Sequence, residues 1–155
     1  MAVSAARFIA IMCLTALAAW GLTGCERESV PTGKWQGSYY DGEWLIAVRI
    51  ELMPGDVIRV SAPMLKADFA HMQQREREQA WIAIQRSLDR QFREAAPGAV
   101  KRQGSEIIRR DGYAPLFEID GNALIFMFYS NGFLTHRIPL QKVAAFDAID
   151  RPKGY

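Results

Sequence analysis

The chain is poor in the residues that most often build metal centres and disulfide frameworks. Its 155 residues include only two cysteines and two histidines. The histidines, His71 and His136, are widely separated in the sequence, whereas zinc and related metals usually need three or four such ligands gathered together. We therefore expect neither a metal nor a cofactor. His136 alternates with Leu134 and Ile138 along a predicted strand, which favours an inward-facing, structural histidine.

Recognisable catalytic motifs are missing as well. The sequence has no His-Glu-x-x-His, Gly-x-Ser-x-Gly, Cys-x-x-Cys or phosphate-loop motif. A Ser-His-Asp triad is defined in space and stays open at this level. A pair of carboxylates for glycoside hydrolysis stays open too, but Glu118 and Asp120 would be arbitrary candidates. We predict no catalytic residues and expect the protein not to be an enzyme.

Neither positive nor negative charge dominates the sequence. Nineteen basic residues oppose seventeen acidic ones, and the two signs are mixed along the chain, giving a net charge of +2. Proteins that bind nucleic acid usually show a basic patch or stripe. We therefore expect no nucleic-acid partner.

The only long apolar run stands at the N-terminus. Residues 8–20 are apolar apart from Thr15, and Arg7 precedes them. This run is shorter than the ~20 residues that a transmembrane helix needs, and it has the length of a signal-peptide core. An uncleaved membrane anchor and a plain secretory signal remain the alternatives.

The run ends in Leu22-Thr23-Gly24-Cys25, which resembles the lipobox of bacterial lipoproteins. The resemblance implies that residues 1–24 are a signal peptide and that Cys25 becomes a lipidated first residue carrying a diacylglyceryl group and a further acyl chain such as palmitate. Two or more acyl chains hold a protein firmly to a membrane. By likeness to enterobacterial lipoproteins, Glu26 in place of Asp favours the outer membrane, facing the periplasm, with the inner membrane as the alternative. No cysteine would then remain for a disulfide.

The remaining chain predicts a tether over 25–32, one α+β domain over 33–146 and a frayed polar tail over 147–155. Period-two alternation is clearest over 43–52, which predicts one face on a core and one mostly in water. Pro139 predicts an edge or an interruption in the last strand. Residues 99–105 read as a basic loop. In all, seven strands are predicted: 34–40, 43–52, 57–62, 106–110, 116–119, 123–129 and 133–143.

A long helix is predicted between the third and fourth of these strands, from Met64 to about Ala96, where Pro97-Gly98 ends it. Its apolar stripe needs a surface to cover, and strand 123–129 is apolar on both faces. We therefore predict that the second half of the helix lies across that strand. The fold class is a curved antiparallel sheet or small β-barrel of about seven strands. The stripe consists of Trp81, Ile84, Leu88 and Phe92.

The start of the first strand, Gly33-Lys34-Trp35, resembles the opening of lipocalins. In that family the Trp closes one end of a barrel and a basic residue late in the barrel packs over it. The resemblance makes Arg137 the counterpart of that basic residue. It also implies an alternative function, the carriage of a small apolar ligand.

Aromatic side chains give the remaining hint of function. Trp35, Tyr39, Tyr40 and Trp44 cluster around the first hairpin, either as barrel packing or as a binding surface. Arg109 and Arg110 beside Tyr113 suggest a contact with an anion. We expect a lipid-anchored envelope protein that acts as a binding or interaction module, with another envelope protein or a small apolar ligand as its partner. A periplasmic hydrolase, or an inhibitor of one, is the remaining alternative.

The lipobox gives the first testable prediction. Cys25→Ser removes the thiol that would carry the lipid, so the variant should accumulate as uncleaved precursor or leave the membrane fraction. Immunoblotting of fractionated cells, with and without globomycin, measures both effects. Normal processing together with full membrane retention of the variant would contradict the assignment.

Overall fold

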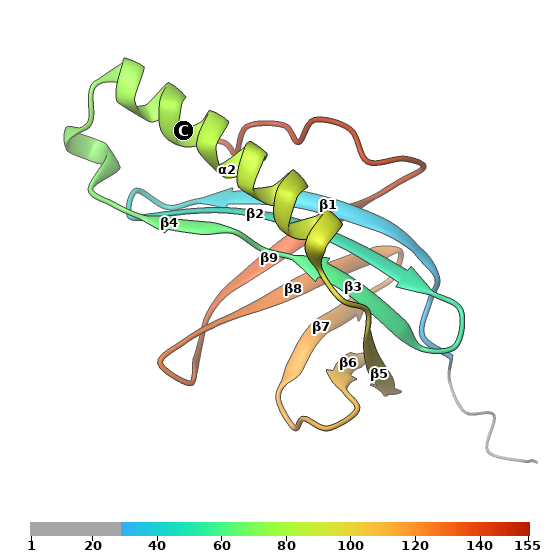
Figure 1. Ribbon diagram of the computed structural model, residues 1–155. Helices are drawn as coiled ribbons and strands as arrows, with labels where there is room; N and C mark the ends of the chain where they lie inside the picture. Colours follow the sequence, from blue (N-terminus) through green and yellow to red (C-terminus); the bar gives the residue numbers. More distant parts are fainter. Residues whose placement is uncertain (1–28) are drawn as a thin grey trace, which may run out of the picture.

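The computed structural model describes residues 29–155, so the predicted signal peptide and Cys25 lie outside the described part. Within it the chain forms a closed antiparallel β-barrel with one long helix outside the wall (Figure 1). The elements are β1 (Gly33–Tyr40), β2 (Trp44–Met53), β3 (Val57–Ser61), β4 (Met64–Lys66), a short 3-10 helix η1 (Phe69–His71), α2 (Gln74–Glu94), β5 (Gly98–Gln103), β6 (Glu106–Arg109), β7 (Pro115–Asp120), β8 (Ala123–Ser130) and β9 (Phe133–Val143).

Eight strands make the wall, in the order β1-β9-β8-β7-β6-β5-β3-β2, and pairing of β1 with β2 closes the ring. The predicted class, α+β with a barrel-like antiparallel sheet, is confirmed. The count of about seven strands is wrong, since the described part has nine. Hairpins join most neighbours, so turns alternate between the two ends of the barrel. We call the end where the chain reaches β1 the entry end, and the other the far end.

Alternation along the strands fills the barrel interior with apolar side chains. Ile46, Val48, Ile50 and Leu52 of β2 all point inward and are buried. At the entry end Val30, just before β1, joins the same core, and its N–H donates to Asp56 in the β2–β3 turn. The other buried members are Trp35, Ile58, Val100, Ile107, Phe117, Leu124, Phe128, Ile138 and Leu140.

The helix covers β2 and not β8, so the predicted contact with strand 123–129 is wrong. The buried stripe of α2 packs on Leu45 and Ala47, which point outward from β2. The stripe itself is core, as predicted. On β8 another arrangement covers the outward face: Arg137 and Glu118, from the strands on either side, form a 2.5 Å ion pair, and Met127 between them is buried.

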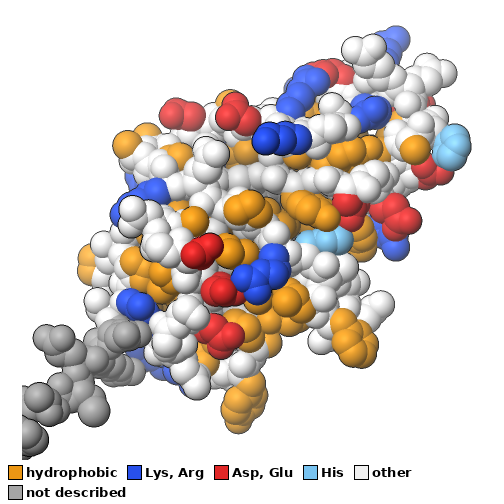
Figure 2. Space-filling model, turned by 180° about the vertical axis from the view of Figure 1, so that it is seen from behind, with side chains coloured by type: hydrophobic (Ala, Val, Ile, Leu, Met, Phe, Trp, Pro, Cys, Tyr) orange, Lys and Arg blue, Asp and Glu red, His pale blue; other side chains and the backbone are white. Residues whose placement is uncertain are grey.

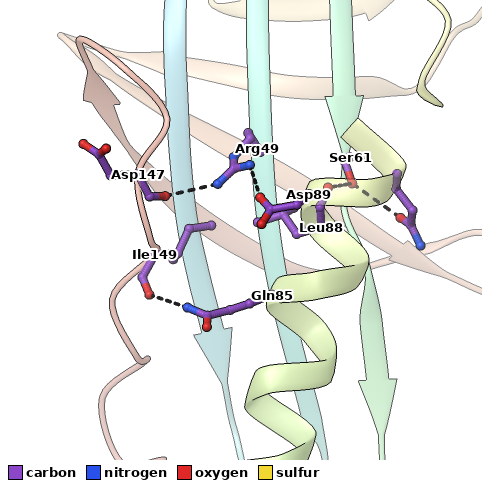
Figure 3. A network of polar contacts seen from close by, with 8 residues as sticks. Arg49, Ser61, Gln85, Leu88, Asp89, Asp147 and Ile149 are labelled. Carbon is purple, nitrogen blue, oxygen red and sulfur yellow. Dashed lines mark hydrogen bonds and ion pairs between the residues drawn. The ribbon is translucent and has the colours of Figure 1, made fainter. Parts of the chain in front are cut away.

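The second face of β2, predicted to lie mostly in water, is therefore buried. Even Arg49 on this face is only 8% exposed. Its guanidinium forms an ion pair with Asp89 of α2 and donates to the Asp147 carbonyl (Figure 3). A buried charge needs such partners because desolvation is costly.

The helix also begins later than predicted. Residues 64–66 form β4, which pairs with the start of β2 along the edge that β3 leaves free after Ser61. Phe69 in η1 is fully buried under Tyr40 and Tyr155. The helix therefore follows the fourth strand and not the third. It ends at Glu94, just before Pro97-Gly98, as predicted.

Residues 98–103, expected in part as a loop, form the barrel strand β5 between β3 and β6. Val100 supplies the inward side chain and is fully buried. Charged neighbours hid this strand in the sequence, because only one strongly apolar residue marks its inner face. At Pro139 the pairing of β1 with β9 is interrupted, as predicted, since it stops at Gln36 and Gln141.

The C-terminal segment, residues 147–155, is docked along α2 rather than frayed. Gln85 donates to the Ile149 carbonyl over 3.2 Å (Figure 3). Arg151 forms an ion pair with Glu78. Ile149 is buried and Tyr155 packs in the same cluster. This segment therefore belongs to the domain. No helix within residues 29–155 is both long and apolar enough to cross a membrane.

The position of the helix gives the second prediction. Leu88 is 1% exposed, and removal of a buried leucine costs ~2–5 kcal/mol. Leu88→Ala should lower the free energy of unfolding by that amount, measured by urea denaturation. Arg86→Ala, an exposed change on the same helix, should shift it by less than ~0.5 kcal/mol. An unchanged midpoint for Leu88→Ala would show that the helix face is not core.

Candidate functional site

The four aromatic residues of the first hairpin do not form one surface. Trp35 lies inside the barrel near the entry end, whereas Tyr39 and Trp44 reach the far end. Tyr40 points to the outside, where it packs on Phe69 and Tyr155. Only Tyr39 and Trp44 are brought together, through their shared contact with His136.

Trp35 closes the entry end, but Arg137 is not the basic residue over it. Lys142 takes that place, with Nζ 5.2 Å from the ring centroid. Gly33 allows this packing, because its φ is +146° and a Cβ there would lie 2.9 Å from the Lys142 side chain. Lys142 faces Trp35 because the two are direct partners between β1 and β9. Arg137 was the wrong choice, because the sequence does not show which residues of two paired strands lie opposite each other.

At the far end, His136 lies among aromatic rings. Its imidazole is stacked on Phe128 at 5.7 Å between centroids and lies 4.7 Å from the Tyr39 ring, with Trp44 at 6.4 Å. The His136 side chain is 12% exposed, and its Nε2 is 3.5 Å from Asp41. His136 therefore faces inward, as predicted. His71 is by contrast exposed and lies 2.6 Å from Asp68.

Asp41 holds the first hairpin together. Its carboxylate accepts the backbone N–H groups of Trp44 at 2.8 Å and Glu43 at 3.0 Å, and the Tyr39 hydroxyl at 3.3 Å. Burial on its own would raise the pKa of Asp41, but these hydrogen bonds and nearby His136 outweigh it and lower the pKa. Asp41 therefore joins Tyr39, Glu43 and Trp44 around the turn, and we call this set of hydrogen bonds the barrel-end clamp.

Large apolar side chains are exposed at the far end. Among the described residues they are Met64, Tyr113, Phe133 and Leu134, of which Tyr113 is 99% and Phe133 78% exposed. Met64 lies in the β3–β5 connection, Tyr113 in the β6–β7 loop, and Phe133 and Leu134 at the start of β9. All of these positions follow strands that run away from the entry end. Seen from the barrel side, hydrophobic side chains project at the margin of the molecule (Figure 2).

A groove opens in the barrel wall between β3 and β6. β5 pairs with β3 only at Val57 and Ile58, because β5 begins at Gly98. Beyond that level no strand of the described part is paired with this edge of β3, and a groove of about 480 Å³ remains. We call it the seam groove; it is lined by Ile58, Val60, Ala96, Gly98, Ala99, Arg109, Arg110, Asp111 and Leu116.

The seam groove contains the two arginines that the sequence paired with an anion, while Tyr113 lies in the adjoining loop. Arg109 lies 3.7 Å from Asp111. The groove itself was not predicted, since it arises where a strand is absent between two others. Within residues 29–155 no cluster of three or more potential metal ligands occurs.

Comparison of the chain with known protein families, with curated proteins and with solved structures gave no match.

The clamp at the far end gives the third prediction. Asp41→Ala removes the carboxylate that accepts two backbone N–H groups. We therefore expect a loss of roughly 1–2 kcal/mol in the free energy of unfolding at pH 7, moderated by partial exposure. The folded pKa of Asp41 is lowered below its ordinary value of 3.8. The contribution is therefore complete above that value and is lost as the pH falls through the folded pKa.

Urea titrations of both proteins between pH 7 and pH 2 measure this effect. The stability difference between parent and Asp41→Ala should be constant at neutral pH and should shrink only in the acid range below the ordinary pKa. A difference that grows on acidification would exclude a lowered folded pKa.

Proposed function

We propose that the protein is a lipid-anchored envelope protein that binds another envelope protein through the far end of its barrel. Cys25 is the proposed anchor, in the outer membrane and facing the periplasm. The observation that carries the proposal is the position of Tyr113, in the β6–β7 loop, and Phe133, at the start of β9. Both are exposed and follow strands that run away from the entry end.

The short tether supports this orientation. Four residue steps separate Cys25 from Ser29, and an extended chain spans at most about 3.6 Å per residue, or roughly 14 Å in total. Val30 is fixed in the core beside the β2–β3 turn. The anchor would therefore hold the entry end near the membrane, and the far end would face the periplasm.

The filled interior favours a protein partner over a ligand held inside the barrel. Large side chains such as Phe117 and Phe128 occupy the axis. Aromatic residues that project into water are the type that dominates protein–protein binding energy. A carrier of the lipocalin kind would instead keep its central volume free, so we rank it second, and the enzymatic alternatives come after it.

The fourth prediction tests this surface by photocrosslinking in intact cells. A benzoylphenylalanine placed at position 113 or 133 of the full chain should form a defined protein adduct. The same probe at position 122, in the β7–β8 turn of the entry end, should not form that adduct. With the probe at 113, Phe133→Ser should reduce the adduct about tenfold or more, because loss of a central aromatic contact commonly costs at least ~2 kcal/mol.

The matched control is Arg90→Ser, an exposed substitution on α2, which should leave the adduct unchanged. Equal adducts from positions 113 and 122 would contradict a specific far-end surface. An adduct that survives Phe133→Ser would show that Phe133 takes no part in binding.

A further inference from the structure

The seam groove combines an apolar floor with a charged rim, which is the pattern of a site for an amphiphile. Ile58 and Val60 of β3 and Leu116 of β7 provide apolar side chains, and Ala96, Gly98 and Ala99 keep the opening free of bulk. Ile58 is 4% exposed and belongs to the barrel core. The groove therefore leads from the surface to the apolar interior of the wall.

Its volume suits a single hydrocarbon chain. Ligand sites typically measure about 300–1,000 Å³, and the seam groove, at about 480 Å³, lies in the lower half of this range. A phospholipid with two chains would need far more apolar surface than this groove offers, because the groove occupies only the gap beside the end of β3. Burial of the methylenes of one chain in the groove is favourable in proportion to the apolar surface removed from water.

Two arginines stand at the rim of the groove, and within the described part of the chain only one of them has an acidic partner. Arg109 is close to Asp111. Arg110 follows it, with its backbone N–H donating to the Ala99 carbonyl over 3.0 Å and its side chain exposed. That hydrogen bond fixes Arg110 at the mouth of the groove. A guanidinium forms two parallel hydrogen bonds with a carboxylate, so one singly charged carboxylate matches this rim.

We propose that the seam groove binds a fatty acid, with its chain along Ile58, Val60 and Leu116 and its carboxylate at Arg110. The groove begins two residues from Asp56, which accepts the N–H of Val30, so its lower end lies close to the start of the described chain. The site itself does not depend on the anchor or on the far-end partner.

An extended peptide is the competing occupant, since β3 has an unpaired edge beside the groove. That edge is only three residues long, Arg59–Ser61, because β3 ends there. Three residues offer few backbone hydrogen bonds to a peptide. The apolar lining and the single charge therefore favour the fatty acid, and the peptide becomes an outcome of the test.

The fifth prediction uses a lauric acid analogue with a diazirine at its chain end, added to membranes that contain the full chain as its cell processes it. After illumination, peptide mapping should place the label in segments 57–61, 96–99 or 115–117. Unlabelled laurate should suppress this labelling, and dodecanol, which has the same chain but no charge, should need about tenfold higher concentration.

Three variants separate the elements of the site. Arg110→Gln should weaken competition by laurate about tenfold and leave that by dodecanol unchanged. Ala96→Trp, at an exposed position of the lining, should abolish the label by filling the groove without disturbing the core. Arg90→Gln on α2 is the matched control and should behave as the parent. Circular dichroism checks that each variant is folded.

Labelling confined to other segments would overturn the proposal, as would equal competition by dodecanol and laurate. Stronger suppression by an extended apolar peptide than by laurate would assign the groove to a peptide instead. None of these outcomes depends on the crosslinks at positions 113 and 133, so failure of the far-end surface and failure of the groove can be told apart.

Discussion

Burial of β2 on both faces is the constraint on which the rest of the molecule depends. Ile46, Val48 and Ile50 point into the barrel, while Leu45 and Ala47 point out and need separate cover. α2 provides that cover, and the C-terminal segment lies beside it. β1, β3 and β4 use the backbone edges of the same strand. One strand thus joins the barrel, the helix and the C-terminal segment into a single domain.

The same arrangement explains why Arg49, alone among the arginines of residues 29–155, is buried. Arg49 stands on the outward face of β2, where a smaller apolar residue would pack under the helix without cost. Instead its guanidinium binds Asp89 on the helix and a carbonyl of the C-terminal segment, and it lies 5.0 Å from the Phe146 ring centroid. The Asp89 side chain is 57% exposed, so the ion pair itself adds little net stability. The contacts of Arg49 join β2, α2 and the C-terminal segment at one point.

The interruption of the barrel wall, by contrast, leaves part of a strand without a neighbour. β2 has paired strands along most of both edges, but β3 loses its neighbour where the chain leaves for the helix and returns only at Gly98. The connection that brings the helix to the outside therefore also leaves the seam groove. The two proposed contacts of the protein follow from different features, since exposed residues at the far end suit a protein and the seam suits a fatty acid.

Local features could be predicted from the sequence: the alternation in 43–52, the stripe of α2 with its end before Pro97, and the break at Pro139. These features depend on near neighbours along the chain. Which strand the helix covers, which basic residue lies over Trp35, and where the wall is open depend on register and on the pairing of distant strands. Strand 98–103 was missed because Val100 alone marks its inner face. The sequence alone favoured strand 123–129 as the surface under the helix, because the outward face of β2 carries Arg49 and Glu51. The pairing of distant strands places Leu45 and Ala47 of β2 against the helix instead.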